Sequence, residues 1–389
     1  MLNLQNTQIA FANQSDTRLQ KAYWLFKLMS SNVLVKIGQT AAQWSLKLNL
    51  PIKPLIRYTI FEQFCGGETI AECDKTIAQL NHYKVGAILD YSVEGNEQEE
   101  DFDLTTLETI RTIQKAKNDP RIPFSVFKIT GLGPHGLLEK ISQNQPLTPS
   151  EEAQWQKTRA RVLKICQTAH DIDQSVFIDA EESWIQNAID GLAMDMMARF
   201  NTQKPIVYNT IQLYRHDRLQ YLKDTAQTAK QNNFLFAIKI VRGAYMERER
   251  HRATQNRYPS PIQPDKQATD TDFDAALLYC IENIKHIAVC AGSHNEQSNV
   301  RLTELMQQFD IEKNHPHIAF SQLYGMSDHI SFNLSNEGYN VSKYLPYGPI
   351  NAVIPYLIRR TQENTSVAGQ MGRELSLLSK EVKRRKLVD

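Results

Sequence analysis

The feature that most constrains the fold of this chain is a change in the pattern of apolar residues near residue 86. From there, short apolar runs rich in β-branched residues alternate with amphipathic stretches as long as the helices of βαβ units. Strands that are buried on both faces read as near-continuous apolar runs, as most of these do. Eight such runs are present, at 87–93, 123–130, 175–180, 205–214, 234–241, 286–293, 318–324 and 340–347.

Helix candidates lie between these runs. Segments with apolar residues at helical spacing occupy 150–171, 184–200, 272–284 and 296–309. Eight β-then-α units favour a closed barrel over an open, doubly wound sheet. The sequence therefore predicts an α/β fold, a distorted (β/α)8 TIM-type barrel. Its predicted domains are a helical extension at 1–85, the barrel at 86–372 and a charged tail at 373–389.

Composition excludes several classes of function. The 44 basic and 43 acidic residues nearly cancel, so no field attracts nucleic acid. The five cysteines are scattered without a CxxC pair, which disfavours disulfide frameworks and zinc sites. The N-terminus has neither the charge pattern nor the apolar core of a signal or transit peptide. No apolar run reaches the roughly 18 residues of a membrane-spanning helix.

Polar side chains follow several predicted strands. Barrel enzymes place their reactive groups at the C-terminal ends of the strands, whereas a structural barrel needs no charge there. Each of these residues alone could be a solvated loop residue or a satisfied buried polar group. Together they indicate one functional rim. They are Lys128, Asp179, Glu181, Glu182, Gln212, Lys239, Arg242, Tyr245, Ser293, His294 and Tyr344.

The strongest local pattern lies on the predicted helix 350–366. Tyr356, Arg359, Arg360 and Glu363 are spaced i, i+3, i+4 and i+7, so they share one face. Apolar neighbours predict that this helix docks on the barrel, and enclosed guanidinium groups need partners. Glu363 alone does not neutralise both arginines, so a carboxylate ligand would complete the balance. The alternative is a solvated surface pair.

Two other patterns carry less weight. Residues 131–136 match GxGxxG, but a dinucleotide fingerprint opens directly into a helix. Here Pro134 interrupts the motif and residues 137–142 predict a short turn at most. Glu151, about twenty residues further on, begins a helix and fits a first-turn dipole partner. His315-Pro316-His317 predicts a turn before the seventh strand, not a metal site.

Taken together, the strand-end segments resemble the proline dehydrogenase family. The match is specific because the terminal arginine-pair helix is present with its spacing to an upstream tyrosine. The wording of LYGMSDHISF and KYLPYGP is similar to the monofunctional, mitochondrial-type branch. The matching segments, in the family's order over about residues 60–365, are FEQFCGG, LDYSVEG, VFIDAEES, IQLY, IKIVRGAYMERER, SHNEQS, SQLYGMSD, KYLPYGP and YLIRRTQEN.

The resemblance implies a reaction. Family members transfer a hydride equivalent from C5 of L-proline to FAD, giving Δ1-pyrroline-5-carboxylate in the first step of proline catabolism to glutamate. A membrane quinone would reoxidise the flavin, with peripheral membrane contact. From the missing transit peptide we expect a protein of the bacterial cytoplasm, on the inner face of the membrane when docked.

Roles carry over from the resemblance residue by residue. Asp179 would hold the cationic cluster, Lys239 would approach the flavin N5 region, and both are expected to be catalytic. Glu363 would orient an arginine. The substrate set is Lys128, Tyr245, Leu323, Tyr344, Tyr356, Arg359 and Arg360. The cofactor set is Ala180, Gln212, Lys239, Gly243, Ala244, Tyr245, Ser293, His294 and Glu363, and no metal residue is expected.

Two of these positions affect the chemistry directly. Many bacterial members have arginine where this chain has Lys239, and lysine offers a point charge in place of a fork. That difference bears on the contact with the flavin. The phenol of Tyr344 against the substrate ring would favour proline over 4-hydroxyproline.

Two other functions stay open at the level of sequence. A barrel lyase or aldolase could use Lys128 or Lys239 to form a Schiff base. A catalytically silent barrel could serve as a binding or scaffold protein.

Overall fold

The computed structural model describes residues 2–30, 53–93, 98–366 and 370–388. Within these ranges the side chains of residues 53, 55, 359–366, 370 and 371 are outside the description. Residues 31–52 of the predicted helical extension lie outside the described residues. The chain divides into two compact units, one of residues 1–94 with 322–389 and one of residues 95–321.

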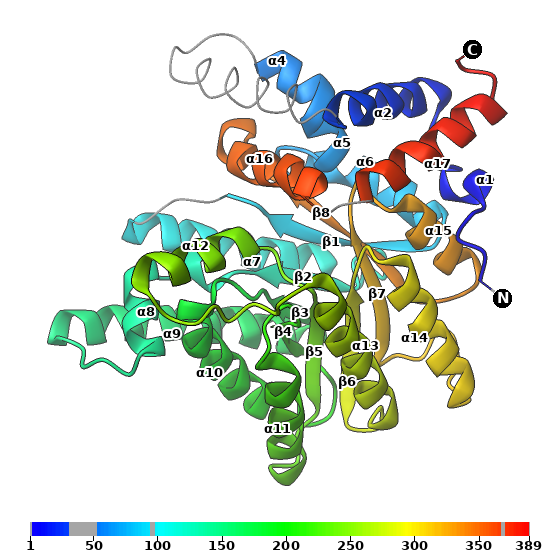
Figure 1. Cartoon of the computed structure of the whole chain (residues 1–389). Helices are drawn as coiled ribbons and strands as arrows, with labels where there is room; N and C mark the ends of the chain where they lie inside the picture. Colours follow the sequence, from blue (N-terminus) through cyan, green and yellow to red (C-terminus); the bar gives the residue numbers. More distant parts are fainter. Residues whose placement is uncertain (1, 31–52, 94–97, 367–369, 389) are drawn as a thin grey trace. The chain divides into compact units, whose positions relative to one another are not determined.

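Eight parallel strands form a closed barrel in chain order (Figure 1). Seven of the eight predicted runs contain one of these strands, and the first run overlaps β1, which begins two residues earlier. The predicted (β/α)8 TIM-type barrel is therefore confirmed. The strands are β1 (Val85–Tyr91), β2 (Phe124–Phe127), β3 (Ser175–Ile178), β4 (Val207–Gln212), β5 (Phe236–Val241), β6 (Ile287–Gly292), β7 (Ile318–Leu323) and β8 (Val341–Tyr347).

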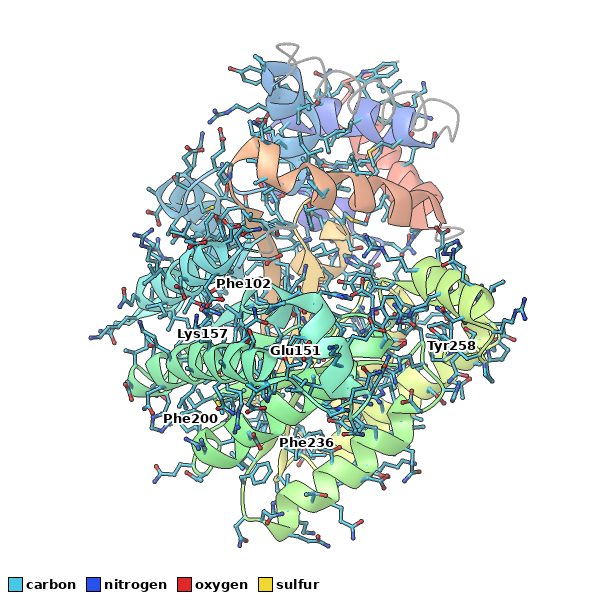
Figure 2. The ribbon with its side chains drawn as sticks, turned by 90° about the vertical axis from the view of Figure 1, so that its left-hand side faces the viewer. Phe102, Glu151, Lys157, Phe200, Phe236 and Tyr258 are labelled. Carbon is cyan, nitrogen blue, oxygen red and sulfur yellow. The ribbon has the colours of Figure 1, made fainter. Side chains whose placement is uncertain are left out.

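In the unit of residues 95–321, strands β2 to β7 pair with their neighbours in sequence. Its core is apolar, and Phe102 and Phe236 are among its fully buried side chains (Figure 2). The four predicted helices at 150–171, 184–200, 272–284 and 296–309 are all present. Its helices are α7 (Glu99–Ala116), α8 (His135–Ser142), α9 (Pro149–Asp171), α10 (Ser183–Phe200), α11 (Arg218–Gln231), α12 (Met246–Asn256), α13 (Lys266–Glu282) and α14 (Glu296–Gln308).

In the other unit, β1 pairs with β8 over seven residues, from Val85 opposite Val341 to Tyr91 opposite Tyr347. The predicted helix at 350–366 is confirmed as α16. The unit contains α1 (Thr7–Ala10), α2 (Asp16–Met29), α4 (Lys53–Ile56), the π-helical turn η1 (Arg57–Phe61), α5 (Glu62–Phe64), α6 (Ile70–His82), α15 (Asp328–Asn336), α16 (Ile350–Ser366) and α17 (Gln370–Arg384).

The C-terminal segment differs from a simple charged tail. Residues 370–384 form helix α17, so α16 is not the last helix. Leu377, Leu378 and Val382 of α17 are buried in an apolar cluster with Leu19 and Phe26 of α2, and the two helices pack together (Figure 1). The charged residues occupy the other positions of an amphipathic helix. The domain boundaries proposed from the sequence stay a prediction.

The GxGxxG segment also differs from expectation. Helix α8 directly follows Pro134, where only a short turn is predicted, because Leu137 and Leu138 are buried and hold the helix in place. Gly133 is needed for packing, since a Cβ there would lie 2.2 Å from Oγ1 of Thr158 on α9. Glu151 completes a capping box with Thr148 at the start of α9. Hydrogen bonds from Lys140 and Thr148 lower the pKa of Glu151 to about 2. Gly133 of this segment therefore serves the packing of the chain against α9.

We predict opposite effects for two alanine substitutions in this segment. Gly133→Ala should lower the free energy of unfolding by about 1–3 kcal/mol, because the new methyl group overlaps Thr158. Gly136→Ala, in α8 with open space around it, should raise it by up to about 1 kcal/mol through helix propensity. Urea denaturation measures both. Equal stabilities of the two variants would contradict the packing role.

Candidate active site

The two residues predicted to be catalytic form an ion pair. Lys239 lies within β5, Asp179 immediately follows β3, and the ammonium group of Lys239 contacts the Asp179 carboxylate. The lysine side chain is 5% exposed, and its ammonium lies 5.2 Å from the centre of the Phe177 ring. A buried ammonium of this kind requires a carboxylate partner. The structure therefore brings these two predicted residues together.

Glu181 is a functional candidate that the role assignment left out. Its backbone carbonyl accepts a hydrogen bond from Nε2 of Gln212 at 2.6 Å, and its N–H donates to Gln186 at 2.9 Å. Its carboxylate accepts from the backbone N–H and the hydroxyl of Thr130. Burial raises the pKa of Glu181 to about 7, although nearby Lys128 lowers it. The only hint in the sequence is the second acidic residue of the DAEE run.

The segment after β5 contains an enforced glycine. Gly243 has φ +135°, and a Cβ there would lie 2.5 Å from the ring of Tyr214. Gly243 and Ala244 are exposed, whereas Tyr245 is half-buried at the N-terminus of α12. Only glycine fits this backbone, and the exposed Gly243 and Ala244 are open to a ligand at this strand end.

Arg242, directly before Gly243, is the second residue that the role assignment missed. Its guanidinium donates to Asp270 at 2.7 Å, to Oγ of Ser293 at 2.8 Å and to Oγ of Ser298 at 3.0 Å. Arg242 thus fixes Ser293, one of the predicted cofactor residues, after β6. Its position inside the VRGAY segment was the available signal.

The remaining predicted site residues of this unit, Lys128 of the substrate set and three of the cofactor set, lie at or just after the ends of strands. Lys128 lies directly after β2 and is half-buried, as is Ala180 two residues after β3. His294 is half-buried two residues after β6. Gln212 is the last residue of β4 and is buried.

The predicted substrate residues of the other unit lie on β7, β8 and α16. Leu323 ends β7 and is half-buried, whereas Tyr344 on β8 and Tyr356 on α16 are buried. The backbone N–H of Tyr324 donates to the carbonyl of Tyr344 at 2.8 Å, which ties the end of β7 to β8. The side chains of Arg359, Arg360 and Glu363 lie outside the described residues, so only their place on the α16 backbone is known.

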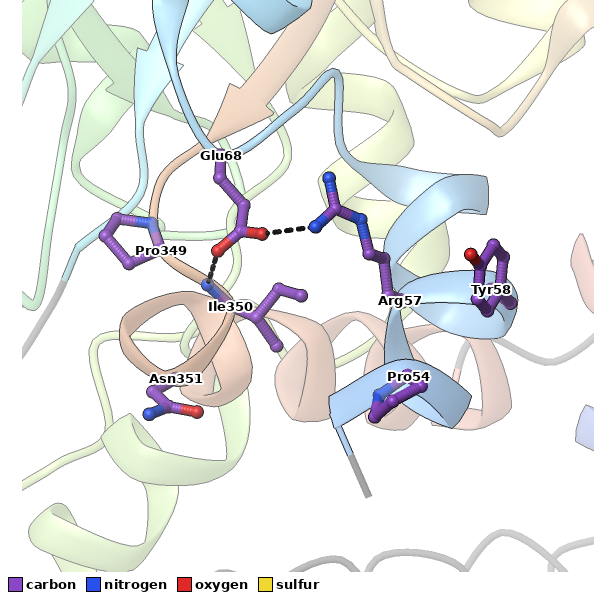
Figure 3. A pocket seen from close by; sticks show the side chains of 7 residues that line it. All are labelled: Pro54, Arg57, Tyr58, Glu68, Pro349, Ile350 and Asn351. Atoms are coloured by element: carbon purple, nitrogen blue, oxygen red, sulfur yellow. Dashed lines mark hydrogen bonds and ion pairs between the residues drawn. The ribbon is translucent and has the colours of Figure 1, made fainter. Parts of the chain in front are cut away.

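The start of α16 is fixed by Glu68. Its carboxylate accepts from the backbone N–H of Ile350 at 3.1 Å and from Arg57 at 2.9 Å (Figure 3). A hollow of about 310 Å³ adjoins these groups. None of the predicted site residues whose side chains the structure describes lines it. Its lining is Pro54, Arg57, Tyr58, Glu68, Pro349, Ile350 and Asn351.

The raised pKa of Glu181 makes a prediction about stability. Folding favours the protonated carboxyl of Glu181. Its contribution to the free energy of unfolding is therefore fully present below about pH 4.5 and is lost as the pH rises through about 7. The shift corresponds to roughly 3 kcal/mol. Glu181→Gln should remove this loss, as measured by urea denaturation between about pH 5 and about pH 8.

Glu182→Gln is the matched control, since Glu182 is also buried but pairs with Arg248 at 2.7 Å. It should keep the wild-type pH dependence attributed to Glu181. Parallel stability curves for wild type and Glu181→Gln would show that the pKa of Glu181 is not raised.

No group of three or more His, Cys, Asp or Glu side chains among the described residues could hold a metal ion. None of the described helices combines the length and hydropathy needed to cross a bilayer.

Comparison with known proteins supplies the family. A relative from Dictyostelium discoideum, mitochondrial proline dehydrogenase 1, is 33% identical, with coverage of 98% of this chain and 74% of the relative. The human mitochondrial proline dehydrogenase 1 is 35% identical, over 69% of this chain and 45% of its own. The carbapenem antibiotics biosynthesis protein CarD of Pectobacterium carotovorum is 35% identical over 83% of each chain.

Solved structures agree on the fold. Proline utilization A (PutA) from Bdellovibrio bacteriovorus aligns with a TM-score of 0.74 and 19% identity. The alignment covers 95% of this chain, which spans 40% of the length of that protein. The family model for proline dehydrogenase matches residues 73–373, which include all eight strands of the barrel. On this match and these relatives, the chain belongs to the proline dehydrogenase family.

Proposed function

We propose that this chain oxidises L-proline to Δ1-pyrroline-5-carboxylate with FAD as its cofactor, the first step of proline catabolism to glutamate. The match to the proline dehydrogenase family over residues 73–373 carries the proposal. Several relatives are named as proline dehydrogenases, whereas CarD is named for antibiotic biosynthesis. The proposed oxidation of proline therefore rests on the family. The proposed place in catabolism goes one step further, because one relative is named for a biosynthetic pathway.

The residues of unit 95–321 fit a flavin. Oε1 of Gln212 is buried and has no hydrogen-bond partner among the residues that the structure describes, while Nε2 is held by Glu181. A buried acceptor held in this way needs a donor, and the N–H on the polar edge of a flavin ring is one. The open backbone at Gly243 and Ala244 suits a cofactor that runs along it. These features support the places of Gln212, Gly243 and Ala244 in the predicted cofactor set, and Ala180, Tyr245, Ser293 and His294 are proposed from the family resemblance.

Substrate binding is proposed on charge. Lys128, Arg359 and Arg360 would pair with the carboxylate of proline, with Glu363 orienting an arginine. The ring would lie against Leu323, Tyr344 and Tyr356, closed in by Tyr245. When bound, FAD accepts the hydride equivalent that leaves C5 of proline. The protein contributes positioning, because a clamped carboxylate fixes where C5 lies.

The Asp179–Lys239 pair weakens the lyase alternative. A Schiff base requires a neutral amine, whereas Lys239 is held as an ammonium against a carboxylate. We assign the pair an electrostatic role, in which Asp179 holds Lys239 in place and Lys239 lies toward the flavin.

For reoxidation we propose a membrane quinone, reached by peripheral contact from the bacterial cytoplasm. Lys21, Trp24 and Leu28 share one face of α2. Trp24 is 51% exposed and Leu28 is 56% exposed, which supports contact of this face with a bilayer. Residues 17–61 contain seven lysines and arginines and no acidic residue. Basic, tryptophan-containing segments of this kind bind anionic bilayers.

The test of the function is the visible spectrum of the purified chain. We expect flavin absorption bands that bleach when L-proline is added without oxygen. A lyase would be colourless and would be trapped by borohydride with its substrate. A silent barrel would purify without flavin and would not be trapped.

A matched pair of variants locates the flavin. Gln212→Leu should weaken FAD binding about tenfold, because the hydrogen bond between two neutral groups, the Gln212 amide and the flavin, is lost. Gln186→Leu is the control, since both ends of that buried amide are already paired within the protein. If Gln186→Leu weakened FAD binding as much, the direct role of Gln212 would be excluded.

Vesicle sedimentation tests the membrane contact. Trp24→Ser combined with Leu28→Ser should reduce binding to phosphatidylglycerol vesicles about tenfold or more, because two apolar side chains no longer enter the bilayer. Leu104→Ser with Leu107→Ser on α7 is the control, since these leucines are also exposed, at 62% and 46%, but stand among acidic residues. Equal losses in the two double variants would contradict a docking surface on α2.

A further inference from the structure

Lys343 on β8 is fully buried and is not used by the proposed chemistry. It directly precedes Tyr344, so the two side chains point to opposite faces of the strand. Its ammonium contacts Oδ1 of Asp328 at 2.7 Å and donates to the carbonyls of Met326 and Leu323. An ammonium has three donors, and these three oxygens satisfy them.

The acceptors of Lys343 lie along residues 323–328, a segment that comprises the last residue of β7, the connecting loop and the first residue of α15. Two residues of this loop have left-handed backbones, Gly325 with φ +77° and Ser327 with φ +52°. Glycine is required at 325, since a Cβ there would lie 2.0 Å from the carbonyl oxygen of Gln63. A non-glycine residue such as Ser327 rarely adopts this conformation unless its surroundings impose it.

The surroundings of the loop come from distant parts of the same unit. Glu374 of α17 is buried, and its carboxylate accepts the backbone N–H of Ser327 at 2.5 Å. Gln63 donates to the carbonyl of Gly325 at 2.8 Å. Gln14 donates to Oδ2 of Asp328 at 2.9 Å, on the oxygen that Lys343 does not use. Both ends of the chain thus hold one loop.

The loop carries a proposed wall of the proline site. This wall is Leu323, the residue of β7 from which the loop continues. The backbone N–H of Tyr324 donates to the carbonyl of Tyr344, and Tyr344 is the second proposed wall. A shift of the turn at Ser327 would therefore move Leu323 against Tyr344.

We propose that Glu374 is a positioning residue for the proline site: from the C-terminal helix it fixes the left-handed turn at Ser327, and through that turn the place of Leu323. This inference rests on the proposed function, because Leu323 and Tyr344 are walls only if proline binds there. Glu374 does not touch substrate or cofactor, so its removal changes substrate binding more than the chemical step.

The experiment is steady-state kinetics of the full-length flavoprotein with L-proline. Glu374→Met keeps the volume of the side chain but removes the acceptor for Ser327. We expect KM for proline to rise about tenfold with kcat changed much less, since ring placement is lost while the flavin stays in place. Glu374→Gln should restore KM, because its amide oxygen still accepts the N–H.

Glu381→Gln is the matched control, since Glu381 is an equally buried glutamate of α17 that pairs with Arg384 and Arg385. It should leave KM unchanged. A Glu374→Met enzyme with wild-type KM, or one that loses kcat and flavin content without a change in KM, would overturn the proposal.

Should Glu374→Met fail to fold, Gln63→Leu decides the question, because Gln63 is only half-buried and holds the same loop. A raised KM supports the proposal and an unchanged KM overturns it. If the wild type neither binds flavin nor oxidises proline, the proposed function fails, and that result is distinct from wild-type activity with an unchanged KM in the variants.

Discussion

A buried ammonium group must be paired, and this constraint organises both units of the chain. In residues 95–321, Lys239 of β5 is held by Asp179 after β3. In the other unit, Lys343 of β8 is held by Asp328 and two backbone carbonyls. Removing one partner of such a pair typically costs about 3–5 kcal/mol, which is a large share of the roughly 5–15 kcal/mol that stabilises a domain. Each pair therefore sets the position of the loops that contain its carboxylate.

The two pairs have different consequences. Asp179 begins the DAEE run, so pairing with Lys239 places Glu181, whose carbonyl in turn orients the Gln212 amide. Chemistry that depends on the position of a flavin benefits from groups fixed in this way before the cofactor binds. Lys343 instead fixes a loop from behind, on the face of β8 opposite Tyr344. The first pair belongs to the groups proposed to act beside the flavin, and the second holds the loop next to Leu323.

The sequence predicted the barrel because strands buried on both faces leave apolar runs that can be counted. It also predicted α16, because the helical spacing of residues 350–366 matches the helix that the backbone forms there. Helix α8 was missed because Pro134 looked like an interruption, although a proline before the first turn leaves the helix intact. Helix α17 was missed because its charged residues conceal the buried stripe of Leu377, Leu378 and Val382.

The site was less predictable than the fold. The pairing of Lys239 with Asp179 and the bonds of Arg242 to Asp270 and Ser293 join residues that are 28 to 60 positions apart in the sequence. No local pattern encodes such contacts, so the sequence placed Glu181 and Arg242 at the predicted rim but gave them no role, and their partners are known only from the structure. The roles of Arg359 and Arg360 come from the family resemblance alone.

The most direct measurement of the central claim is anaerobic stopped-flow reduction of the flavin by L-proline carrying deuterium at C5. If the site transfers a hydride equivalent from C5, the absorbance of the oxidised flavin disappears several-fold more slowly with the labelled substrate than with unlabelled proline. Flavin that is not reduced by proline, or that is reduced at the same rate by both substrates, would contradict the account.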